Sequence, residues 1–354
     1  MLDRCVNYPI WDDDGKSAIK LNSIQKDAIA VFLTKVKNGK YRYINNPCLC
    51  GYSKESTDVL LTKKDRFGIP CKNLLCRNCG LIRLKDRLDD ESTATFYRDD
   101  YRNIYVGLDI ATSDFFNSQT QRGVEFYKFI SQFVDIQKIK TIFEVGCGAG
   151  GIVNAFNHEG RLVSGCDYGE KYLAFGREKG LNLYQGELSS THTKKGSQDL
   201  IILSHVMEHF NNPIQSLTSI TEFIKPEGYL FVEVPGIFNI PKTYFNPLMY
   251  FQNAHVYNFH YSYLVVLFET IGLEVIIGDE KCSFLLRKPK DWIVKDIQYI
   301  QPNLELNANV IEKKIKTYYL LHIFKINPFL YRCLLSGLLR KTGITKFITT
   351  LVHR

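Results

Sequence analysis

The feature that most constrains the fold is an apolar run that ends in a cluster of glycines. Residues 141–145 read Thr-Ile-Phe-Glu-Val, and glycines follow at positions 146, 148, 150 and 151, before a second apolar run at 152–156. The first run predicts a buried strand and the second a helix. Only glycine lets backbone pass close to a ligand without a Cβ clash. The segment therefore predicts a strand, a ligand-binding turn and a helix, which together open an α/β sheet.

A second predicted strand places a carboxylate beside this turn. The run Arg161–Cys166 ends at Asp167, 21 positions after Gly146. At that spacing the second strand of a βαβ unit presents an acid to ribose hydroxyls, so we expect a nucleoside cofactor. The glycines at 146, 148 and 151 also fit the dinucleotide pattern, and by themselves they do not distinguish a nicotinamide from another adenosyl cofactor.

Glu144, two residues before the first glycine, favours S-adenosylmethionine. A carboxylate there accepts a hydrogen bond from a cationic amino group, which this cofactor carries on its methionine end and a dinucleotide lacks. The alternative is a strand-end carboxylate that caps nearby backbone N–H groups. A nicotinamide oxidoreductase remains the competing enzyme class, although only one glycine βαβ unit is visible in the sequence.

Short β-branched runs alternate with helical patterns over the middle of the chain, which indicates an α/β sheet of seven strands. The expected strands are Lys140–Val145, Arg161–Cys166, Leu181–Tyr184, Asp199–Leu203, Tyr229–Val234, Leu273–Gly278 and Cys282–Arg287. Helices are expected at Asn22–Val36 and, as a cover for the sheet, at Gly123–Val134. Pro235–His260 interrupts the rhythm with prolines and aromatics, and we interpret it as a long insertion over the active-site end.

Four segments resemble class I S-adenosylmethionine-dependent methyltransferases and follow that family's order. Residues 144–150 resemble the first motif, 165–168 the second-strand acid, and 199–209 and 224–233 the fourth strand and the turn into the fifth. The resemblance covers about residues 120–290 and implies a Rossmann-like seven-stranded sheet that binds S-adenosyl-L-methionine. The cofactor-binding residues that it implies are Glu144, Gly146, Gly148, Gly150, Asp167, Tyr168, Glu187, Ser204 and His205.

Two close cysteine pairs precede this region. Cys48 and Cys50 form the first pair, Cys76 and Cys79 the second, and a glycine follows each pair. Four soft ligands in two pairs match tetrahedral zinc, and a segment this short needs such a staple to fold, so we predict a structural Zn²⁺. Free structural cysteines are the alternative, and Cys71 is a fifth thiol that could substitute as a ligand.

The cysteine pairs, with residues 65–70 and 96–105, resemble the zinc-binding domain that precedes some sugar-modifying methyltransferases. That resemblance implies a carbohydrate-related acceptor, either a nucleotide sugar or a lipid-linked glycan, and a role in polysaccharide biosynthesis. It also implies a catalytic histidine in the insertion, where His255 is the expected base. A hydrogen-bonded loop histidine is the alternative.

Further candidate catalytic residues are His209, after the fourth strand, and Tyr257, in the insertion. The i, i+3, i+4 spacing of His205, Glu208 and His209 predicts one helical face beside the cofactor. Such a set can ligate a cation or handle protons, or it can line the pocket without any metal.

The residues predict five parts: an N-terminal helical segment (1–44), a zinc-binding module (45–88), a helical connector (89–135), a methyltransferase domain (136–290) and a basic helical tail (291–354). With 354 residues, 45% of them hydrophobic, the chain can bury one sizeable core and a second one. Disordered and collagen-like classes are thereby excluded. A non-catalytic adaptor that retains the cofactor fold is the alternative to an enzyme.

The basic excess of the chain lies at its C-terminal end. The net charge is +8, but nine Lys and Arg and no acid fall between Lys313 and Arg354, so the preceding residues carry −1. Residues 329–340 form an amphipathic pattern that fits a membrane surface or a protein groove, or that packs on the sheet. No secretory signal or spanning helix is visible, so we expect a cytoplasmic protein, with peripheral contact at the inner face of a membrane, and no nucleic acid as partner.

Overall fold

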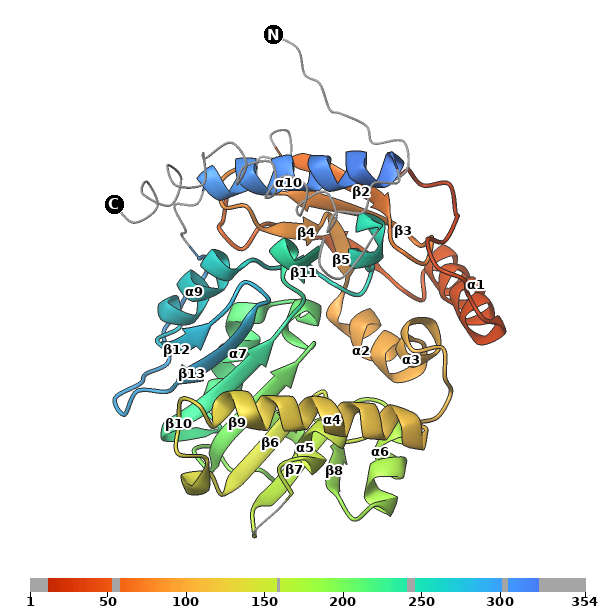
Figure 1. The fold of residues 1–354 in the computed structure, drawn as a ribbon. Helices are drawn as coiled ribbons and strands as arrows, with labels where there is room; N and C mark the ends of the chain where they lie inside the picture. The colour runs from red at the N-terminus through yellow and green to blue at the C-terminus, as the bar shows by residue number, and fades with distance from the viewer. Residues whose placement is uncertain (1–11, 53–57, 158–159, 241–245, 301–304, 325–354) are drawn as a thin grey trace, which may run out of the picture.

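The computed structural model describes residues 12–52, 58–157, 160–240, 246–300 and 305–324. In Figure 1 a large α/β sheet lies below a smaller, mainly N-terminal sheet, and one long helix crosses the far side of the smaller sheet. The helices α2 and α3 lie beside the junction of the two sheets.

The large sheet has seven strands in the order β12-β13-β10-β9-β6-β7-β8. All neighbours pair in parallel except β13, which runs antiparallel to both β10 and β12. The strands are β6 Thr141–Val145, β7 Leu162–Asp167, β8 Asn182–Gln185, β9 Gln198–Ser204, β10 Ile224–Glu233, β12 Glu274–Gly278 and β13 Ser283–Arg287. All seven predicted strands and the α/β class are confirmed.

Alternate residues of the central strands face two separate cores, as the period of two in a strand requires. In β9, Leu200 and Ile202 pack with α4, α5 and α6, while Ile201 and Leu203 pack with α7 and α9. The central strands are therefore buried on both faces, which explains their continuous apolar sequences. The covering helices are α4 Ser113–Ile130, α5 Gly151–Asn154, α6 Glu170–Glu178, α7 Pro213–Thr221 and α9 Tyr261–Thr270.

Helix α4 begins ten residues before the predicted start at Gly123, so that boundary was wrong. The helix starts where Thr112 accepts a hydrogen bond from the N–H of Phe115, an N-cap that fixes its first turn. The polar first half of α4 carries few apolar residues, which is why the periodicity only becomes visible later. At the other end of the chain, α1 Ser23–Lys37 agrees with the predicted helix and has Asn22 as its N-cap.

The smaller sheet is built from distant parts of the chain. Its order is β11-β4-β3-β2, and a separate two-stranded pair joins β1 to β5. The strands are β1 Tyr43–Asn45, β2 Val59–Lys64, β3 Pro70–Leu75, β4 Ile82–Leu84, β5 Asp86–Leu88 and β11 Tyr257–Asn258, and the adjoining helices are α2 Asp90–Asp99 and α3 Tyr101–Tyr105. Strand β11 belongs to the predicted insertion, so this segment is a strand of the N-terminal sheet as well as a cover.

The long helix α10, Glu305–Ile323, packs on the smaller sheet. Ile311, Ile315 and Tyr318 share a core with Leu61 of β2 and Ile82 of β4. The part of the predicted tail that the structure describes therefore packs on the smaller sheet through an apolar face. The amphipathic pattern at 329–340 lies outside the described residues, so membrane contact stays a prediction. Among the described helices, none has the length and apolarity to cross a membrane.

Gly123 provides a test of the α4–α5 contact. A Cβ on this residue would lie 2.4 Å from the carbonyl oxygen of Ile152 and 2.7 Å from Cβ of Ala155. The added methyl group could be accommodated only if the backbone of α5 moved away from α4. Gly123→Ala should therefore lower the free energy of unfolding by about 1–3 kcal/mol, measured by urea denaturation. Lys128→Ala, at an exposed position of the same helix, is the matched control and should change it by less than about 0.5 kcal/mol. Equal stability of the two variants would contradict this packing.

Candidate active site

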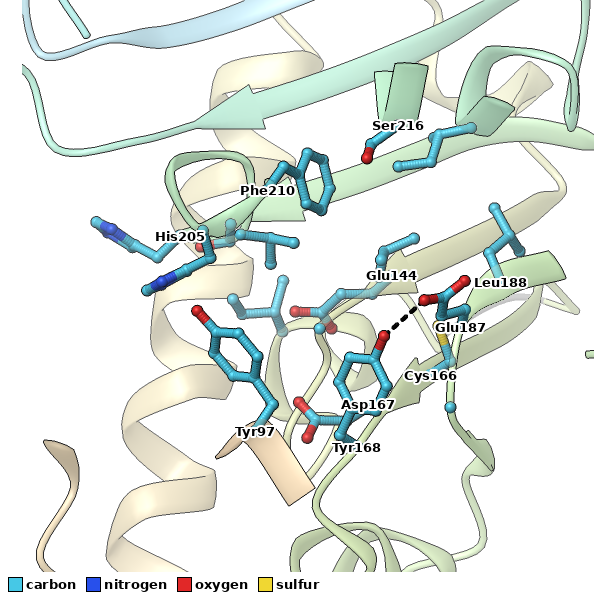
Figure 2. Close-up of a pocket in the computed structure, with 18 of the residues that line it drawn as sticks. Tyr97, Glu144, Cys166, Asp167, Tyr168, Glu187, Leu188, His205, Phe210 and Ser216 are labelled. Atoms are coloured by element: carbon cyan, nitrogen blue, oxygen red, sulfur yellow. Dashed lines mark hydrogen bonds between the residues drawn. The ribbon is translucent and has the colours of Figure 1, made fainter. Parts of the chain in front are cut away.

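A cavity of about 1140 Å³ lies at the carboxyl ends of the central strands. Each of five neighbouring strands contributes side chains at or just beyond its end, which is where ligands bind open α/β sheets. These side chains are Glu144, Asp167, Glu187, Ser204 and Glu233. Figure 2 shows the acidic residues Glu144, Asp167 and Glu187 converging on one space, with His205 at the opposite end.

The glycine turn holds this end of the sheet together. Gly148 has φ of 57° and donates its N–H to Oδ2 of Asp167 at 2.9 Å. A Cβ on Gly146 would meet Cγ2 of Val206 at 2.4 Å, so a side chain there would displace the segment after β9. Gly146 lines the cavity, whereas Gly148 and Gly150 do not belong to its lining. The two later glycines therefore shape the turn.

Glu144 lines the cavity but is only 2% exposed. Its Oε2 accepts a hydrogen bond of 3.1 Å from the N–H of Val153 in α5. This bond is the backbone cap that was the alternative interpretation of Glu144. Its other carboxylate oxygen accepts no hydrogen bond from the described residues. Burial raises the pKa of Glu144 to about 8, and it outweighs the opposing effects of the Val153 N–H and of the Arg122 charge. A ligand with an amino group at this position would supply an adjacent cation.

Asp167 is surrounded by donors. It accepts hydrogen bonds from the N–H of Gly148 and of Gly169, and its Oδ2 also pairs with Nη2 of Arg102 at 2.7 Å. Arg102 comes from α3 and lines the cavity, so the connector reaches the predicted ribose position. The role of this arginine is not evident from the sequence.

The end of the cavity beside β8 is largely apolar. Its side chains come from β7, the segment after β8, and both ends of α7: Cys166, Leu188, Phe210, Ile220 and Phe223. At its edge the hydroxyl of Tyr168 donates to Oε1 of Glu187 at 2.8 Å (Figure 2). A flat base fits such an apolar wall with polar groups at its rim.

The opposite end is charged. Arg122 of α4 pairs with Glu233 at the end of β10 and contacts the ring of His205. His205 has φ of 54°, and its Nδ1 lies 3.3 Å from Oε1 of Glu208. Arg122 and Glu233 were missed in the sequence. Glu233 had a signal, because it is an acid at the carboxyl end of a central strand, whereas Arg122 had none.

The expected helical face of His205, Glu208 and His209 is wrong. The left-handed backbone at His205 prevents an α-helix, and only the short 3₁₀ turn η4, Met207–His209, forms. The three side chains nevertheless converge, because Glu208 points between the two imidazoles, with Oε1 4.0 Å from Nε2 of His209.

His209 is the candidate catalytic histidine that reaches the cavity. Its Nδ1 lies 2.8 Å from the carbonyl oxygen of Ala254, which accepts the ring proton and leaves the lone pair on Nε2. The rings of Tyr97 and Tyr101 contact it edge-on, at centroid distances of 5.7 and 5.6 Å. Burial lowers the pKa of His209 below its ordinary 6.5, so the imidazole is neutral at pH 7.

The placement of His255 and Tyr257 differs from the prediction that they meet the acceptor. Neither residue lines the cavity, and they are 4% and 2% exposed. His255 lies behind His209, with ring centroids 4.9 Å apart, and Tyr257 donates its hydroxyl to Asn46. The insertion forms β11 at Tyr257, whose side chain points toward the N-terminal sheet, whereas the ring of His255 lies against His209 and Glu208 at the back of the cavity wall.

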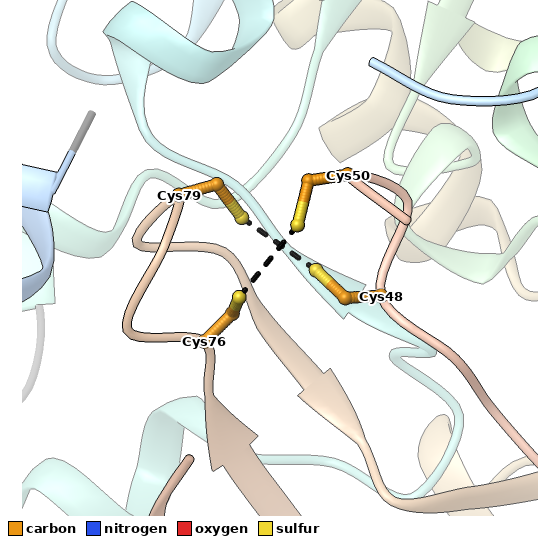
Figure 3. Close-up of side chains that lie close together, drawn as sticks. All are labelled: Cys48, Cys50, Cys76 and Cys79. Carbon is orange, nitrogen blue, oxygen red and sulfur yellow. Dashed lines mark hydrogen bonds between the residues drawn. The ribbon is translucent and has the colours of Figure 1, made fainter. Parts of the chain in front are cut away.

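The four predicted thiols form a second cluster, in the smaller sheet (Figure 3). Sγ of Cys48 lies 3.5 Å from Sγ of Cys79, and Sγ of Cys50 lies 3.8 Å from Sγ of Cys76. A tetrahedron with Zn–S bonds of about 2.3 Å has edges of about 3.8 Å, so these separations fit zinc. Cys71 lies apart in β3, where its thiol accepts a hydrogen bond from Asn73.

Comparison with known proteins agrees with this geometry. Residues 143–232 match the family described as Methyltransferase domain. This match covers strands β6 to β10, and we call the large-sheet region the methyltransferase domain. The cavity lies at the carboxyl ends of the matched strands.

Relatives of the methyltransferase domain include the ubiquinone biosynthesis O-methyltransferases of Serratia proteamaculans and Saccharophagus degradans. The first is 30% identical over 99 residues, covering 26% of this chain and 41% of the relative. The second is 28% identical over 114 residues, covering 30% and 47%. The match thus spans less than half the length of these relatives.

Solved structures similar to the methyltransferase domain include the plantazolicin methyltransferase BpumL in complex with SAH and a SAM-dependent methyltransferase from Archaeoglobus fulgidus. The first has 13% identity and a TM-score of 0.43, and covers 56% of this chain and 94% of that one. The second has 21% identity and a TM-score of 0.36, with 44% and 69% covered.

The raised pKa of Glu144 provides a test of its predicted role in binding the amino group of the cofactor. At pH 7 the free carboxyl is mostly protonated, because its pKa is about 8. An adjacent ammonium group lowers the pKa of a carboxyl by about 1–3 units, so S-adenosylhomocysteine should displace about 0.4–0.9 of a proton at pH 7 and bind more tightly as pH rises toward 8. Calorimetry in buffers of different ionisation enthalpy measures this. Glu144→Gln should release none, and a wild-type chain that also releases none would contradict the assignment.

Proposed function

We propose that the chain transfers the methyl group of S-adenosylmethionine to a hydroxyl of a carbohydrate-related acceptor. The observation that carries the proposal is one cavity with three kinds of wall: an apolar end beside Leu188, an acidic strand edge at Glu144 and Asp167, and a histidine at His209. Its volume of about 1140 Å³ exceeds the roughly 300–1,000 Å³ of a typical small-molecule site, which leaves room for a second substrate.

The cofactor lies along the strand edge in this proposal. The adenine occupies the apolar end, the ribose lies near Asp167, and the amino group meets Glu144. Two cationic centres of the cofactor, the ammonium and the sulfonium, then face the acidic side chains of the edge. Arg122, which lines the cavity and pairs with Glu233, is the cation assigned to the carboxylate of the methionine end.

The rest of the wall supports a hydroxyl-rich acceptor. Between α2 and α7 the cavity is lined by Asp90, Thr93, Asn211, Asn212 and Gln215. Asn211 donates from Nδ2 to Oδ1 of Asp90 at 2.7 Å and to Oγ1 of Thr93 at 3.0 Å. Amide and carboxylate groups held in this way pair with sugar hydroxyls. The relatives are named as O-methyltransferases, which agrees with an oxygen acceptor.

His209 is the histidine that activates the acceptor, in place of His255. Its Nε2 carries the lone pair, because Nδ1 is engaged by Ala254. The sulfonium already activates the methyl group, so the chain has to align the acceptor oxygen with it and increase the negative charge on that oxygen.

The four thiols hold a structural zinc ion in this proposal. All four cysteines are buried in one core with Leu81 and with Tyr263 and Leu264 of α9. Zinc would join the segment that holds Cys48 and Cys50 to the turn that holds Cys76 and Cys79. No step of the methyl transfer involves it.

His209→Gln should lower the turnover number about 100-fold while leaving the affinity for S-adenosylhomocysteine unchanged. In the wild type, turnover should fall as pH drops below the lowered pKa of His209, because the protonated ring has no lone pair to offer. Labelled methyl transfer to a panel of nucleotide sugars and lipid-linked glycans measures both effects. His192→Gln, at an exposed histidine, is the control. Equal turnover of the two variants would refute the assignment.

Cys79→Ser should remove one equivalent of bound zinc and lower the free energy of unfolding by about 4 kcal/mol or more. Cys71→Ser, a buried thiol outside the cluster, should retain the zinc. Metal analysis by mass spectrometry and thermal denaturation measure the two quantities. Loss of the same metal from both variants would refute the four-thiol site.

A further inference from the structure

A second set of candidate metal ligands lies between the methyltransferase cavity and the smaller sheet. Glu208, His209 and His255 each offer one ligand atom, and these atoms lie within 4.8 Å of one another. Oε1 of Glu208 is 4.0 Å from Nε2 of His209 and 3.9 Å from Nε2 of His255. This set differs from the one that the sequence suggested, because His255 from the insertion replaces His205.

The three side chains are buried and two of them have unmatched polar atoms. Glu208 is 1% exposed and His255 is 4% exposed. Oε2 of Glu208 and Nδ1 of His255 have no hydrogen-bond partner among the described residues. These atoms differ from Oε1 of Glu208 and Nε2 of the two histidines, which lie 3.9–4.0 Å apart. A buried carboxylate beside these imidazoles is costly, and a cation held between them would stabilise it.

We infer that Glu208, His209 and His255 bind a divalent transition-metal ion, and that this ion is how His209 activates the acceptor. The inference rests on the proposed function and extends it. Two imidazoles and one carboxylate are a ligand set that suits zinc and its neighbours in the first transition row. Three protein ligands leave a coordination position for a substrate oxygen, as in catalytic sites.

The distances agree with such a site after a small contraction. Metal bonds of about 2.1 Å to nitrogen and oxygen give a tetrahedral edge of about 3.4 Å, compared with the 3.9 and 4.0 Å between these atoms. The carbonyl of Ala254 holds Nδ1 of His209, which is the outer hydrogen bond that orients a ligating imidazole. The lone pair of Nε2 therefore points toward Glu208 without rotation of the ring.

The ion would lie beside the reacting atoms. His205 and His209 line the cavity, and Nδ1 of His205 is 3.3 Å from the same Oε1 of Glu208. An acceptor hydroxyl bound to the ion loses its proton to water, and the resulting alkoxide attacks the methyl carbon. The new O–C bond forms as the C–S bond breaks. The electron pair of the C–S bond stays on sulfur, so the sulfonium becomes the neutral thioether of S-adenosylhomocysteine.

Zinc stoichiometry of the full chain tests the site. After incubation with Zn²⁺ and gel filtration, mass spectrometry should find two zinc ions per wild-type chain. Glu208→Gln and His255→Gln should each retain one, in the four thiols, and His192→Gln should retain two. Cys79→Ser should keep the ion of the histidine site. Binding of S-adenosylhomocysteine by each variant checks that it is folded, because neither Glu208 nor His255 lines the cavity.

The inference would be overturned if the wild-type chain binds one zinc ion and the Glu208→Gln and His255→Gln variants bind the same amount. If such a chain still transfers methyl groups, the proposed function stands and the metal site fails. If two ions bind but no hydroxyl acceptor is methylated, the metal site stands and the proposed function fails. If His255→Gln also lowers methyl transfer at least about 10-fold together with zinc content, the ion acts in the reaction.

Discussion

The arrangement of the site depends on β11. Through this two-residue strand, the segment that follows β10 of the large sheet pairs with β4 of the smaller sheet. Tyr257 and Asn258 pair with Arg83 and Ile82 of β4, more than 170 positions earlier in the chain. The residues just before them are also fixed by N-terminal groups: the N–H of Asn253 donates to Asp65, and the N–H of Ala254 donates to the hydroxyl of Tyr105. The carbonyl of Ala254 then sets the ring of His209. The smaller sheet thus contributes to the cavity by holding the segment that orients a histidine.

Charge organises the rest of the cavity. Carboxylates stand at the ends of four of the strands, or just after them, and in the proposed function they face a cofactor with two cationic centres. Two arginines from the helices preceding the sheet pair with these acids, Arg102 with Asp167 and Arg122 with Glu233. Glu144 has no such cation, and burial raises its pKa. Glu144, a buried carboxyl without a paired arginine, is the one assigned to the cofactor amino group.

The parts that the sequence predicted are those determined by neighbours along the chain. The seven strands follow from local apolar runs, the turn from glycines at fixed spacing, and the thiol cluster from two short cysteine pairs. The parts that it missed depend on contacts between distant segments. The position of His255 follows from the β11–β4 pairing. Arg102 belongs to helix α3 and reaches Asp167 at the end of strand β7. Local periodicity also failed at His205, where the left-handed backbone replaces the expected helix.

The central claim is that this strand edge binds S-adenosylmethionine. Isothermal titration of the full chain with S-adenosylhomocysteine and with NAD tests it most directly, because both ligands carry an adenosine and only the first has an amino acid end. The account predicts saturable binding of S-adenosylhomocysteine, about one per chain, and no binding of NAD under the same conditions. Binding of NAD without binding of S-adenosylhomocysteine would contradict it.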